Sequence, residues 1–492
     1  MRPGLVMAAL AAVAGCQSVG TGRHTPRVNL DGRSILLDGR LDEWPADAAA
    51  MADPDFMYFR VSVGEPTNLQ QSRETLHLMV DLDDDPSTGR VDPGDEATDG
   101  LGIDLEVQFS PASADGTRTE GGVRVFGYDA AGGSIPLSHA DIDLLFLPTY
   151  TSEWFEVRFS RHLTHLAGLP GPSTSAAGVF VLSSPDGEVV GSSDPFEVQM
   201  PRLAQGRARR DATIPDKGDA LRIVSFNVLK ASPRDDPEPF GRILQVLDPD
   251  IVLFQEWDDA TAQELATWFT LHVWHEVPWQ AMVSQGRGVA IVSRHSIRPL
   301  LPESISAPGG DWPVREVGAV VDTPIGPVAA TSVHLKCCGG SEQDARRLAE
   351  TTAVNDALRS AMTFPSASAG QDGADVSPPS IVVIGGDMNL VGSPEPLARL
   401  GHALDLDASD LGVAKPIVRG DSAVYSWRDP ASEFSIGRLD YLLYSDASAR
   451  VVRSFVLDGS RLTDAALARL GLDRGDTATS DHLPIVIDIA PR

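Results

Sequence analysis

Short apolar runs that end in acidic, amide or histidine residues recur in the last third of the chain and constrain its fold most strongly. In Ile384-Gly-Gly-Asp387-Met-Asn389 a carboxylate and an amide directly follow a strand-like run. Arg438-Leu-Asp440-Tyr441 and Ser480-Asp481-His482 repeat the pattern nearer the C-terminus. A β-sheet presents metal ligands and bases in this way, at the ends of its strands. The pattern therefore predicts a sheet with a catalytic edge, and so an enzyme.

Length and charge limit the classes of protein that remain. The chain has 492 residues, 42% of them hydrophobic, so two folded domains are expected rather than one core. Its formal net charge of -29 repels polyanions, and its few lysines never form a run. Neither nonspecific coating of nucleic acid nor a stable nucleic-acid complex is therefore expected.

Residues 1–27 have the pattern of a bacterial lipoprotein signal and tether. Arg2 precedes an apolar stretch, and the small residues Ala14 and Gly15 precede Cys16. The apolar stretch is too short to span a bilayer. We therefore expect export to the periplasm or the cell surface, with membrane contact only through a lipid on Cys16. An ordinary cleaved signal and a disordered tail are the alternatives.

The other two cysteines, Cys337 and Cys338, are adjacent. In an exported protein they are compatible with a strained vicinal disulfide, and equally with free thiols packed beside the site. A zinc site is disfavoured because no further cysteine is at hand and adjacent residues rarely aim at one metal together.

Strand patterns divide the rest of the chain. Residues 28–200 contain alternating runs such as Thr75–Asp81 and Gly102–Phe109, separated by turns rich in Gly, Asp and Pro. That spacing predicts an all-β sandwich. Residues 201–219 show no clear period and are predicted to be a linker. In residues 220–492 short apolar strands alternate with helical stretches, which predicts a mixed α/β fold.

Candidate ligands in the α/β part fall at strand ends and include few histidines. They are Asn227, Glu256, His334, Asp387, Asn389, Asp440, Asp481 and His482. All of them could converge on one edge of a sandwich. A site rich in carboxylate and amide oxygens suits Mg²⁺ or Mn²⁺ rather than zinc, because hard cations prefer such ligands.

The order of these motifs resembles the endonuclease/exonuclease/phosphatase superfamily, which has the deoxyribonuclease I-like fold. The motifs are Ser225-Phe-Asn227, Gln255-Glu256, His334-Leu335, Gly386-Asp387-Met-Asn389, Arg438-Leu-Asp440-Tyr441 and Ser480-Asp481-His482. One motif alone is weak, but the ordered set is strong and covers roughly residues 220 to 490. The resemblance implies a four-layered α/β sandwich and metal-dependent cleavage of phosphoester bonds.

The resemblance also implies a role for each residue. Glu256 would bind the divalent cation, with Asn227 and Asp481 contributing to the metal or its waters. His482 would act as general base or acid on the attacking water, and Asp440 would orient its imidazole, because a neutral histidine needs a partner on its second nitrogen. The remaining roles concern the phosphate: Asp387 and Asn389 would position the nucleophile and a phosphate oxygen, and His334 would neutralise transition-state charge. Either Asp387 or His482 could take the proton.

Several of these residues also have ordinary structural interpretations. An Asp-x-Asn after a strand is often a turn, Glu256 could begin a helix, and His334 could be a hydrogen-bonded core residue. Arg315 is a candidate phosphate contact or a surface ion pair. Trp427 is interpreted as a core residue rather than a substrate wall.

The first domain resembles the family 9 carbohydrate-binding-module-like sandwiches of exported bacterial proteins. The resemblance rests on the run 37–44, on the run 80–89 and on Gly102-Ile-Asp104. Asp81, Asp83 and Asp85 alternate after a strand, a spacing that can gather oxygens around Ca²⁺. An EF-hand is excluded because Pro86 stands where its loop needs glycine. Glycan binding through this domain is a further expectation, and a spacer or surface adaptor is the alternative.

Together these observations predict an exported, metal-dependent phosphoesterase. A true endonuclease acting on extracellular DNA or RNA and a non-catalytic surface binding lipoprotein are the alternatives. The phosphoester substrate is left open between nucleic acid, a phospholipid head group, and an inositol or sugar phosphate.

Overall fold

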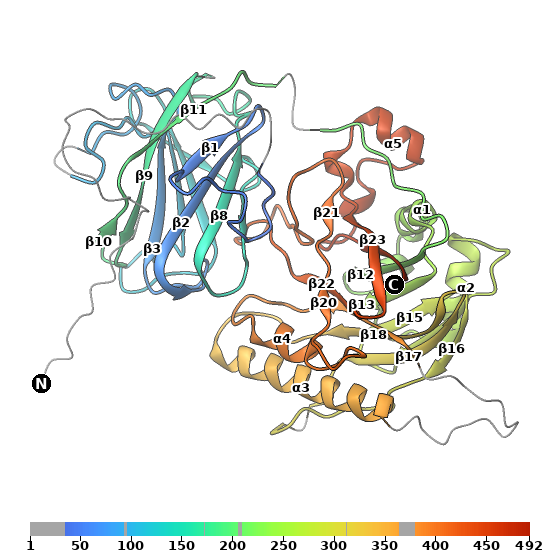
Figure 1. The fold of residues 1–492 in the computed structure, drawn as a ribbon. Coiled ribbons are helices and arrows are strands. Elements are labelled where there is room, and N and C mark those ends of the chain that lie inside the picture. Colours follow the sequence, from blue (N-terminus) through green and yellow to red (C-terminus); the bar gives the residue numbers. More distant parts are fainter. Residues whose placement is uncertain (1–34, 93–95, 172, 205–208, 311, 364–378) are drawn as a thin grey trace, which may run out of the picture. The chain divides into compact units, whose positions relative to one another are not determined.

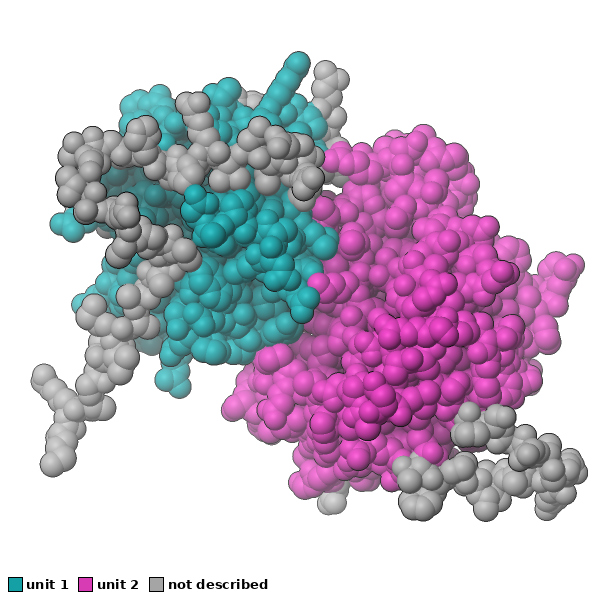
Figure 2. Space-filling view, viewed as in Figure 1, with its two compact units in different colours: residues 1–208, 428–437 teal, residues 209–427, 438–492 magenta. Residues whose placement is uncertain are grey.

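A computed structural model describes residues 35–92, 96–171, 173–204, 209–310, 312–363 and 379–492. The chain forms two compact units (Figures 1 and 2). Unit 1 comprises residues 1–208 and 428–437, and unit 2 comprises residues 209–427 and 438–492. Cys16 lies outside the described residues, so its lipid modification stays a prediction. Among the described helices, none has the length and apolarity needed to cross a bilayer.

In the described residues of unit 1 the regular elements are all strands, arranged in two sheets. One sheet has the order β1-β2-β8-β7, and the other has the order β10-β9-β3-β4-β5-β6, with β11 also paired to β9. The strands are β1 (Ala50–Ala52), β2 (Phe56–Thr67), β3 (Thr75–Asp81), β4 (Leu105–Phe109), β5 (Val123–Tyr128), β6 (Ser134–Leu137), β7 (Leu145–Leu147), β8 (Ser152–Ser160), β9 (Ser175–Ser183), β10 (Val189–Ser192) and β11 (Phe196–Gln199). The predicted all-β sandwich is confirmed.

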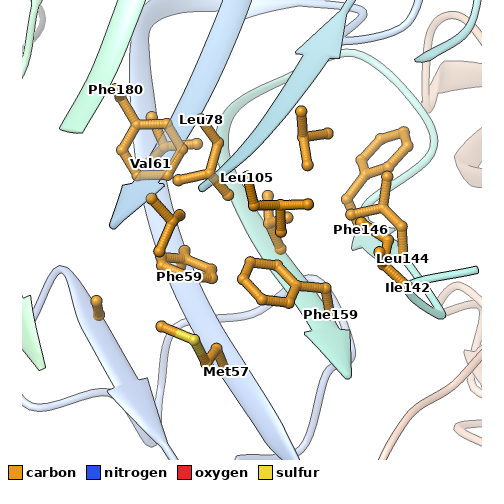
Figure 3. Close-up of a cluster of buried hydrophobic side chains, with 14 of the residues drawn as sticks. Met57, Phe59, Val61, Leu78, Leu105, Ile142, Leu144, Phe146, Phe159 and Phe180 are labelled. Carbon is orange, nitrogen blue, oxygen red and sulfur yellow. The ribbon is translucent and has the colours of Figure 1, made fainter. Parts of the chain in front are cut away.

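The core of unit 1 follows from the two-residue period of its strands. Alternate residues of β2 and β8 point inward, so that Phe59 and Phe159 stack with their ring centroids 5.4 Å apart (Figure 3). Phe180 of β9 meets Phe59 edge-on from the other sheet. These aromatic contacts join the two sheets of the sandwich. The likeness of this unit to carbohydrate-binding modules, and its binding of a glycan, stay predictions.

The predicted calcium ligands of unit 1 are placed differently from the expectation. Oxygen atoms of Asp81, Asp83 and Asp104 lie within 4.8 Å of one another. Asp85 is exposed, and its carboxylate accepts hydrogen bonds from the backbone and hydroxyl of Ser87 instead. Asp104 therefore takes the place that the sequence suggested for Asp85, because the adjoining strand β4 brings residue 104 beside the end of β3. Calcium binding stays a prediction.

Residues 428–437 belong to unit 1, although the chain on either side of them belongs to unit 2. The backbone N–H of Val123 in β5 donates to the carbonyl of Glu433 (2.8 Å). The side-chain Oε1 of Gln70 accepts the N–H of Ser435 (3.0 Å), and Leu145 pairs with Ile436 in a β-bridge. The prediction that this segment belongs to the domain of residues 220–492 was wrong, because no local pattern marks backbone pairing with so distant a part of the chain.

Unit 2 contains two further sheets. The first has the order β14-β15-β13-β12-β24-β23-β21, and the second has the order β16-β17-β18-β19-β22-β20. The strands are β12 (Leu221–Asn227), β13 (Ile251–Gln255), β14 (Gln280–Ser284), β15 (Val289–Ser293), β16 (Ser296–Pro299), β17 (Glu316–Thr323), β18 (Gly326–His334), β19 (Ile381–Asp387), β20 (Gly412–Val413), β21 (Ile417–Val418), β22 (Asp440–Tyr444), β23 (Ala449–Val456) and β24 (Ile485–Pro491).

Helices cover the outer faces of these two sheets. They are α1 (Pro237–Leu247), α2 (Ala262–His272), α3 (Ser341–Thr363), α4 (Glu395–Gly401) and α5 (Asp464–Leu470), with the short 3₁₀ turns η1 (Ser232–Arg234), η2 (Gly459–Arg461) and η3 (Asp476–Ala478). Apolar residues of α1, α2 and α5 share one buried cluster with the first sheet, while α3 and α4 lie along the second (Figure 1). The predicted four-layered α/β sandwich is confirmed.

Small and polar residues let the two sheets of unit 2 approach closely beside the strand ends. A Cβ added to Gly385 in β19 would lie 2.7 Å from the side chain of Leu253 in the facing sheet. Next to it, Gln255 Nε2 donates to Ser332 Oγ (2.9 Å), and Ser332 Oγ donates to the Phe254 carbonyl (2.8 Å). These buried hydrogen bonds join β13 to β18 and fix the strand ends relative to one another.

Candidate active site

The strand ends of unit 2 bring the predicted ligands together. In the parallel pairing of β12 with β13, Asn227 lies opposite Gln255, the residue before Glu256. In the second sheet His334, Asp387 and Asp440 lie opposite one another at the ends of β18, β19 and β22. Asp481 and His482 lie four and three residues before β24, which pairs with β12. The predicted convergence is therefore a feature of the fold.

Asp387 lies at the centre of this cluster and is almost fully buried. Its Oδ2 accepts hydrogen bonds from Asn389 Nδ2 (2.9 Å) and Asn227 Nδ2 (3.3 Å). The same oxygen lies 3.3 Å from His334 Nε2 and 3.6 Å from His482 Nε2. Burial alone would raise the pKa of Asp387, but the charge of His482 and the hydrogen bond and charge of His334 outweigh it and hold the pKa at about 2. Asp387 is therefore a carboxylate, and a weak base.

His482 is held by a carboxylate on its other side. Its Nδ1 lies 2.8 Å from Asp440 Oδ2, and both side chains are buried. Burial alone would lower the pKa of His482, but the carboxylates of Asp440 and Asp387 raise it to about 10. Burial raises the pKa of Asp440, while His482 opposes that shift. At neutral pH the ring is therefore an imidazolium, with Nδ1–H donating to Asp440 and Nε2–H facing Asp387. When the ring is neutral and Nδ1 keeps its hydrogen on Asp440, the lone pair of Nε2 is directed toward the cluster.

Ser426, which was not among the residues predicted from the sequence, completes this arrangement. Its hydroxyl donates to Asp440 Oδ2 (2.7 Å), the oxygen that faces His482. The same hydroxyl oxygen accepts the backbone N–H groups of Leu439 (3.1 Å) and Asp440 (2.9 Å). Ser426 therefore fixes both the backbone and the side chain of Asp440. A lone serine carries no signal that would have identified it from the sequence.

Glu256 and Asn227 form the second side of the cluster. Glu256 Oε1 accepts from Asn227 Nδ2 (3.1 Å), and Oε2 accepts the backbone N–H of Lys230 (2.9 Å). Glu256 does not begin a helix, since α2 starts only at Ala262. Its backbone has φ +59°, in the left-handed region that costs a residue other than glycine about 1–3 kcal/mol. Such strain is concentrated at functional sites, where the surrounding fold imposes it.

Asp481 is oriented by Trp427. The indole Nε1 donates to Asp481 Oδ2 (2.9 Å), and the two neighbouring backbones pair in a bridge between Trp427 and His482. Trp427 is half-buried, so its interpretation as a core residue was wrong. It reaches the site because the bridge carries it beside the strand end, which adjacent sequence letters do not reveal.

At this cluster, two buried carboxylate oxygens have no hydrogen-bond partner among the described residues. They are Oδ1 of Asp481 and Oδ1 of Asp440. Leaving such an atom without a partner is costly, so each calls for an explanation such as an ion or water. Asp481 Oδ1, together with the carboxylate of Glu256 and the amide of Asn227, offers the kind of oxygen ligand that a hard divalent cation prefers. Asp387, Asp440 and His482 are an alternative group of ligands, since one atom of each lies within 4.8 Å of the others. In this group, however, Asp440 Oδ2 and His482 Nδ1 are hydrogen-bonded to each other.

The other predicted residues lie beside this cluster. Asn389 has φ +48°, and its Nδ2 donates to the Leu335 carbonyl (3.2 Å) as well as to Asp387. Arg315 Nη2 donates to the same carbonyl (2.7 Å), and its predicted surface ion pair is not found among the described residues. Arg315 is therefore hydrogen-bonded to the backbone of Leu335, the residue that follows His334. A contact between Arg315 and phosphate stays a prediction.

Comparison with known proteins identifies a family over the same region. Residues 224–482, more than half of the chain, match the Endonuclease/Exonuclease/phosphatase family. A search of curated proteins found no match.

Solved structures similar to this chain cover about half of it. A beta toxin variant from Staphylococcus aureus with bound magnesium ions has 18% identity, over 55% of this chain and 99% of that one, with a TM-score of 0.34. Sphingomyelinase C from Streptomyces griseocarneus has 17% identity over 55% and 99%, with a TM-score of 0.35. A 3′ phosphatase from Neisseria bound to a product DNA hairpin has 19% identity over 55% and 98%, with a TM-score of 0.35.

Proposed function

Because this chain belongs to the endonuclease/exonuclease/phosphatase family, and is thus a divalent-metal-dependent phosphoric ester hydrolase, we propose that its unit 2 hydrolyses a phosphodiester or phosphomonoester with His482 as the general base. The observation that carries the proposal is the orientation of the His482 ring. Nδ1 is hydrogen-bonded to Asp440, and Nε2 faces Asp387 in the acidic cluster. A phosphoryl group and a cation would bind at this cluster.

The contrast between the two candidates favours His482 as the proton acceptor. Asp387 has its pKa lowered to about 2, whereas that of His482 is raised to about 10, so His482 is the stronger base. The pKa of His482 must fall when a cation binds nearby, because like charges disfavour the imidazolium. Asp440 stabilises the imidazolium that forms when water gives up its proton. Asp387 then acts as a fixed negative charge that positions the nucleophile.

The remaining residues have roles that fit their contacts. Glu256, Asn227 and Asp481 would hold Mg²⁺ or Mn²⁺, since they offer carboxylate and amide oxygens, one of them an unpartnered Asp481 Oδ1. Such a cation, when bound, neutralises phosphoryl charge and polarises the ester. Asn389 is hydrogen-bonded to Asp387, and His334 lies close to the same carboxylate. Both would donate hydrogen bonds to the phosphoryl oxygens in the transition state.

Metal removal tests the activity. The full-length protein is expected to hydrolyse bis-(nitrophenyl) phosphate with Mg²⁺ or Mn²⁺, to lose that activity in excess EDTA, and to regain it when either ion is restored, because the buried acidic cluster repels phosphate without a cation. Release of nitrophenolate is the measurement. Turnover that survives EDTA would contradict the proposal, and metal binding without turnover on any phosphoester would favour a surface binding protein.

The substrate class is tested with natural phosphoesters under the same conditions. Plasmid nicking would assign an endonuclease that acts on extracellular DNA, release of phosphocholine from sphingomyelin would assign a phospholipid head group, and release of free phosphate would assign an inositol or sugar phosphate. The net charge of -29 opposes long nucleic acids, so we propose one of the smaller substrates.

The location of the enzyme is a separate proposal. We propose that the protein is exported and tethered to a bacterial membrane through lipid-modified Cys16, on the basis of the signal pattern in residues 1–27. Cys16→Ser is expected to move the protein from the membrane fraction to the soluble fraction, or to leave it unprocessed. A Cys338→Ser variant is the matched control and should fractionate as the wild type does. Unchanged membrane association of the Cys16 variant would refute the tether.

A further inference from the structure

Cys337 and Cys338 lie three and four residues after His334, on the segment that joins β18 to α3. Their sulfur atoms are 2.7 Å apart, and both side chains are thiols. Cys337 is half-buried and Cys338 is exposed. The ammonium of Lys336 lies 3.4 Å from Cys337 Sγ. None of these three side chains has a part in the proposed hydrolysis.

The surroundings of the pair activate one of the two thiols. Burial alone would raise the pKa of Cys337, but the hydrogen bonds from Cys338 and Lys336 and the charges of Lys336 and Arg315 lower it. A thiol of lowered pKa beside a cation, within reach of solvent and of a second thiol, has the features of a redox-active cysteine.

Hydrogen bonds connect the backbone around the two cysteines to residues of the active site. The fully buried guanidinium of Arg347 donates from Nη1 to the carbonyls of Lys336 and Cys338, each at 2.7 Å. One residue earlier, the Leu335 carbonyl accepts from Asn389 and Arg315, and the Leu335 N–H donates to the Asp387 carbonyl (2.9 Å). A change in the backbone at residues 336–338 is therefore transmitted through Leu335 to Asn389 and Asp387.

We propose that Cys337 and Cys338 form a reversible redox site that takes small-molecule disulfides and slows the hydrolysis when it is oxidised. The Cys337 thiolate attacks one sulfur of the external disulfide, forms a mixed disulfide and releases one thiolate. Cys338 then loses its proton to solvent and attacks Cys337 Sγ, which forms the vicinal bond and releases the second thiol. The external disulfide is reduced to two thiols, and the protein dithiol is oxidised.

The geometry of adjacent residues makes this bond a labile one. Neighbouring Cα atoms are about 3.8 Å apart, whereas ordinary disulfides join Cα atoms about 4.4–6.8 Å apart. The vicinal bond is therefore strained, and strained, exposed disulfides have oxidising potentials typical of regulatory sites. Cys338 has φ +76°, and Arg347 holds its carbonyl, so the strain of the small ring acts on a backbone segment that is fixed to the buried Arg347.

The test uses the full-length protein, oxidised glutathione as the external disulfide and Cys338→Ser as the variant. After oxidation and alkylation, intact mass is expected to show both thiols lost without a bound glutathione, and peptide mapping should locate the bond at residues 337 and 338. The rate with bis-(nitrophenyl) phosphate and Mn²⁺ is expected to fall at least about tenfold and to recover with dithiothreitol, because small displacements near reacting groups are costly. The Cys338→Ser variant should retain the wild-type reduced rate, and oxidised glutathione should leave it with a mixed disulfide instead.

Two outcomes would overturn this inference. One is that both thiols remain open to alkylation after oxidation, and the other is that the vicinal bond forms while the rate stays unchanged. The slowing effect rests on the proposed hydrolysis, so inactive reduced protein would refute that function and not the redox site. In that case hydrogen exchange at residues 334–340, compared between the reduced and oxidised protein, shows whether the bond alters the backbone beside Asp387.

Discussion

His482→Ala is expected to lower kcat on bis-(nitrophenyl) phosphate by about 10²- to 10⁴-fold, the range that a general base contributes. His482 is the residue whose Nδ1 is fixed by Asp440 and whose Nε2 faces Asp387, so alanine removes the base and leaves the acidic cluster in place. Nitrophenolate release at saturating Mn²⁺ is the measurement. Because His482 is not among the proposed metal ligands, the concentration of Mn²⁺ that gives half-maximal rate should change little.

A surface histidine provides the matched control. The side chain of His275 lies in unit 2 and is 84% exposed, and among the described residues its ion-pair partner is the adjacent Glu276. His275→Ala should leave kcat and the melting temperature unchanged. Retention of near wild-type kcat by His482→Ala would exclude the general-base role and would leave Asp387 as the acceptor.

The convergence of the site was predictable because it depends on strand order and not on side-chain detail. Asn227, His334 and Asp387 each end a strand, and parallel pairing necessarily brings the ends of β12 and β13, and of β18 and β19, to the same edge. The apolar runs that precede these residues specify the strands. The strands, and the meeting of these side chains at one edge, were therefore predictable from the sequence, while their roles as ligands stay predictions.

Contacts made through tertiary bridges were not predictable in the same way. Ser426 and Trp427 reach Asp440 and Asp481 because their own backbone pairs beside His482, and nothing in their local sequence marks that pairing. The same reason applies to Asp104, which replaces Asp85 in the acidic group of unit 1 only because β4 lies beside β3. Side chains that orient other side chains are invisible until the register between distant strands is known.

Glu256→Gln is expected to raise the Mn²⁺ concentration for half-maximal rate by at least about 100-fold, since even outer partners of metal ligands cost 10- to 100-fold in affinity when removed. The amide is similar in size to the carboxylate, so the packing around residue 256 is unchanged. The backbone at this position therefore keeps its strained conformation, with φ +59°. One carboxylate oxygen is replaced by an NH₂ group, which must face either Asn227 Nδ2 or the Lys230 N–H, both of them donors. The variant therefore loses a negative charge and one hydrogen bond at once.

The two variants separate binding from chemistry through their response to metal. Raising Mn²⁺ should restore much of the rate of Glu256→Gln but none of the rate of His482→Ala, because only the first loses affinity for the ion. Glu276→Gln, at a side chain that is 86% exposed, is the matched control and should need no more Mn²⁺ than the wild type. If Glu256→Gln needs no more Mn²⁺ than the wild type, the proposed cation site at Glu256 is wrong. The cation would then be assigned to the alternative acidic group of Asp387 and Asp440, and Asp440 would be a metal ligand as well as the partner of His482.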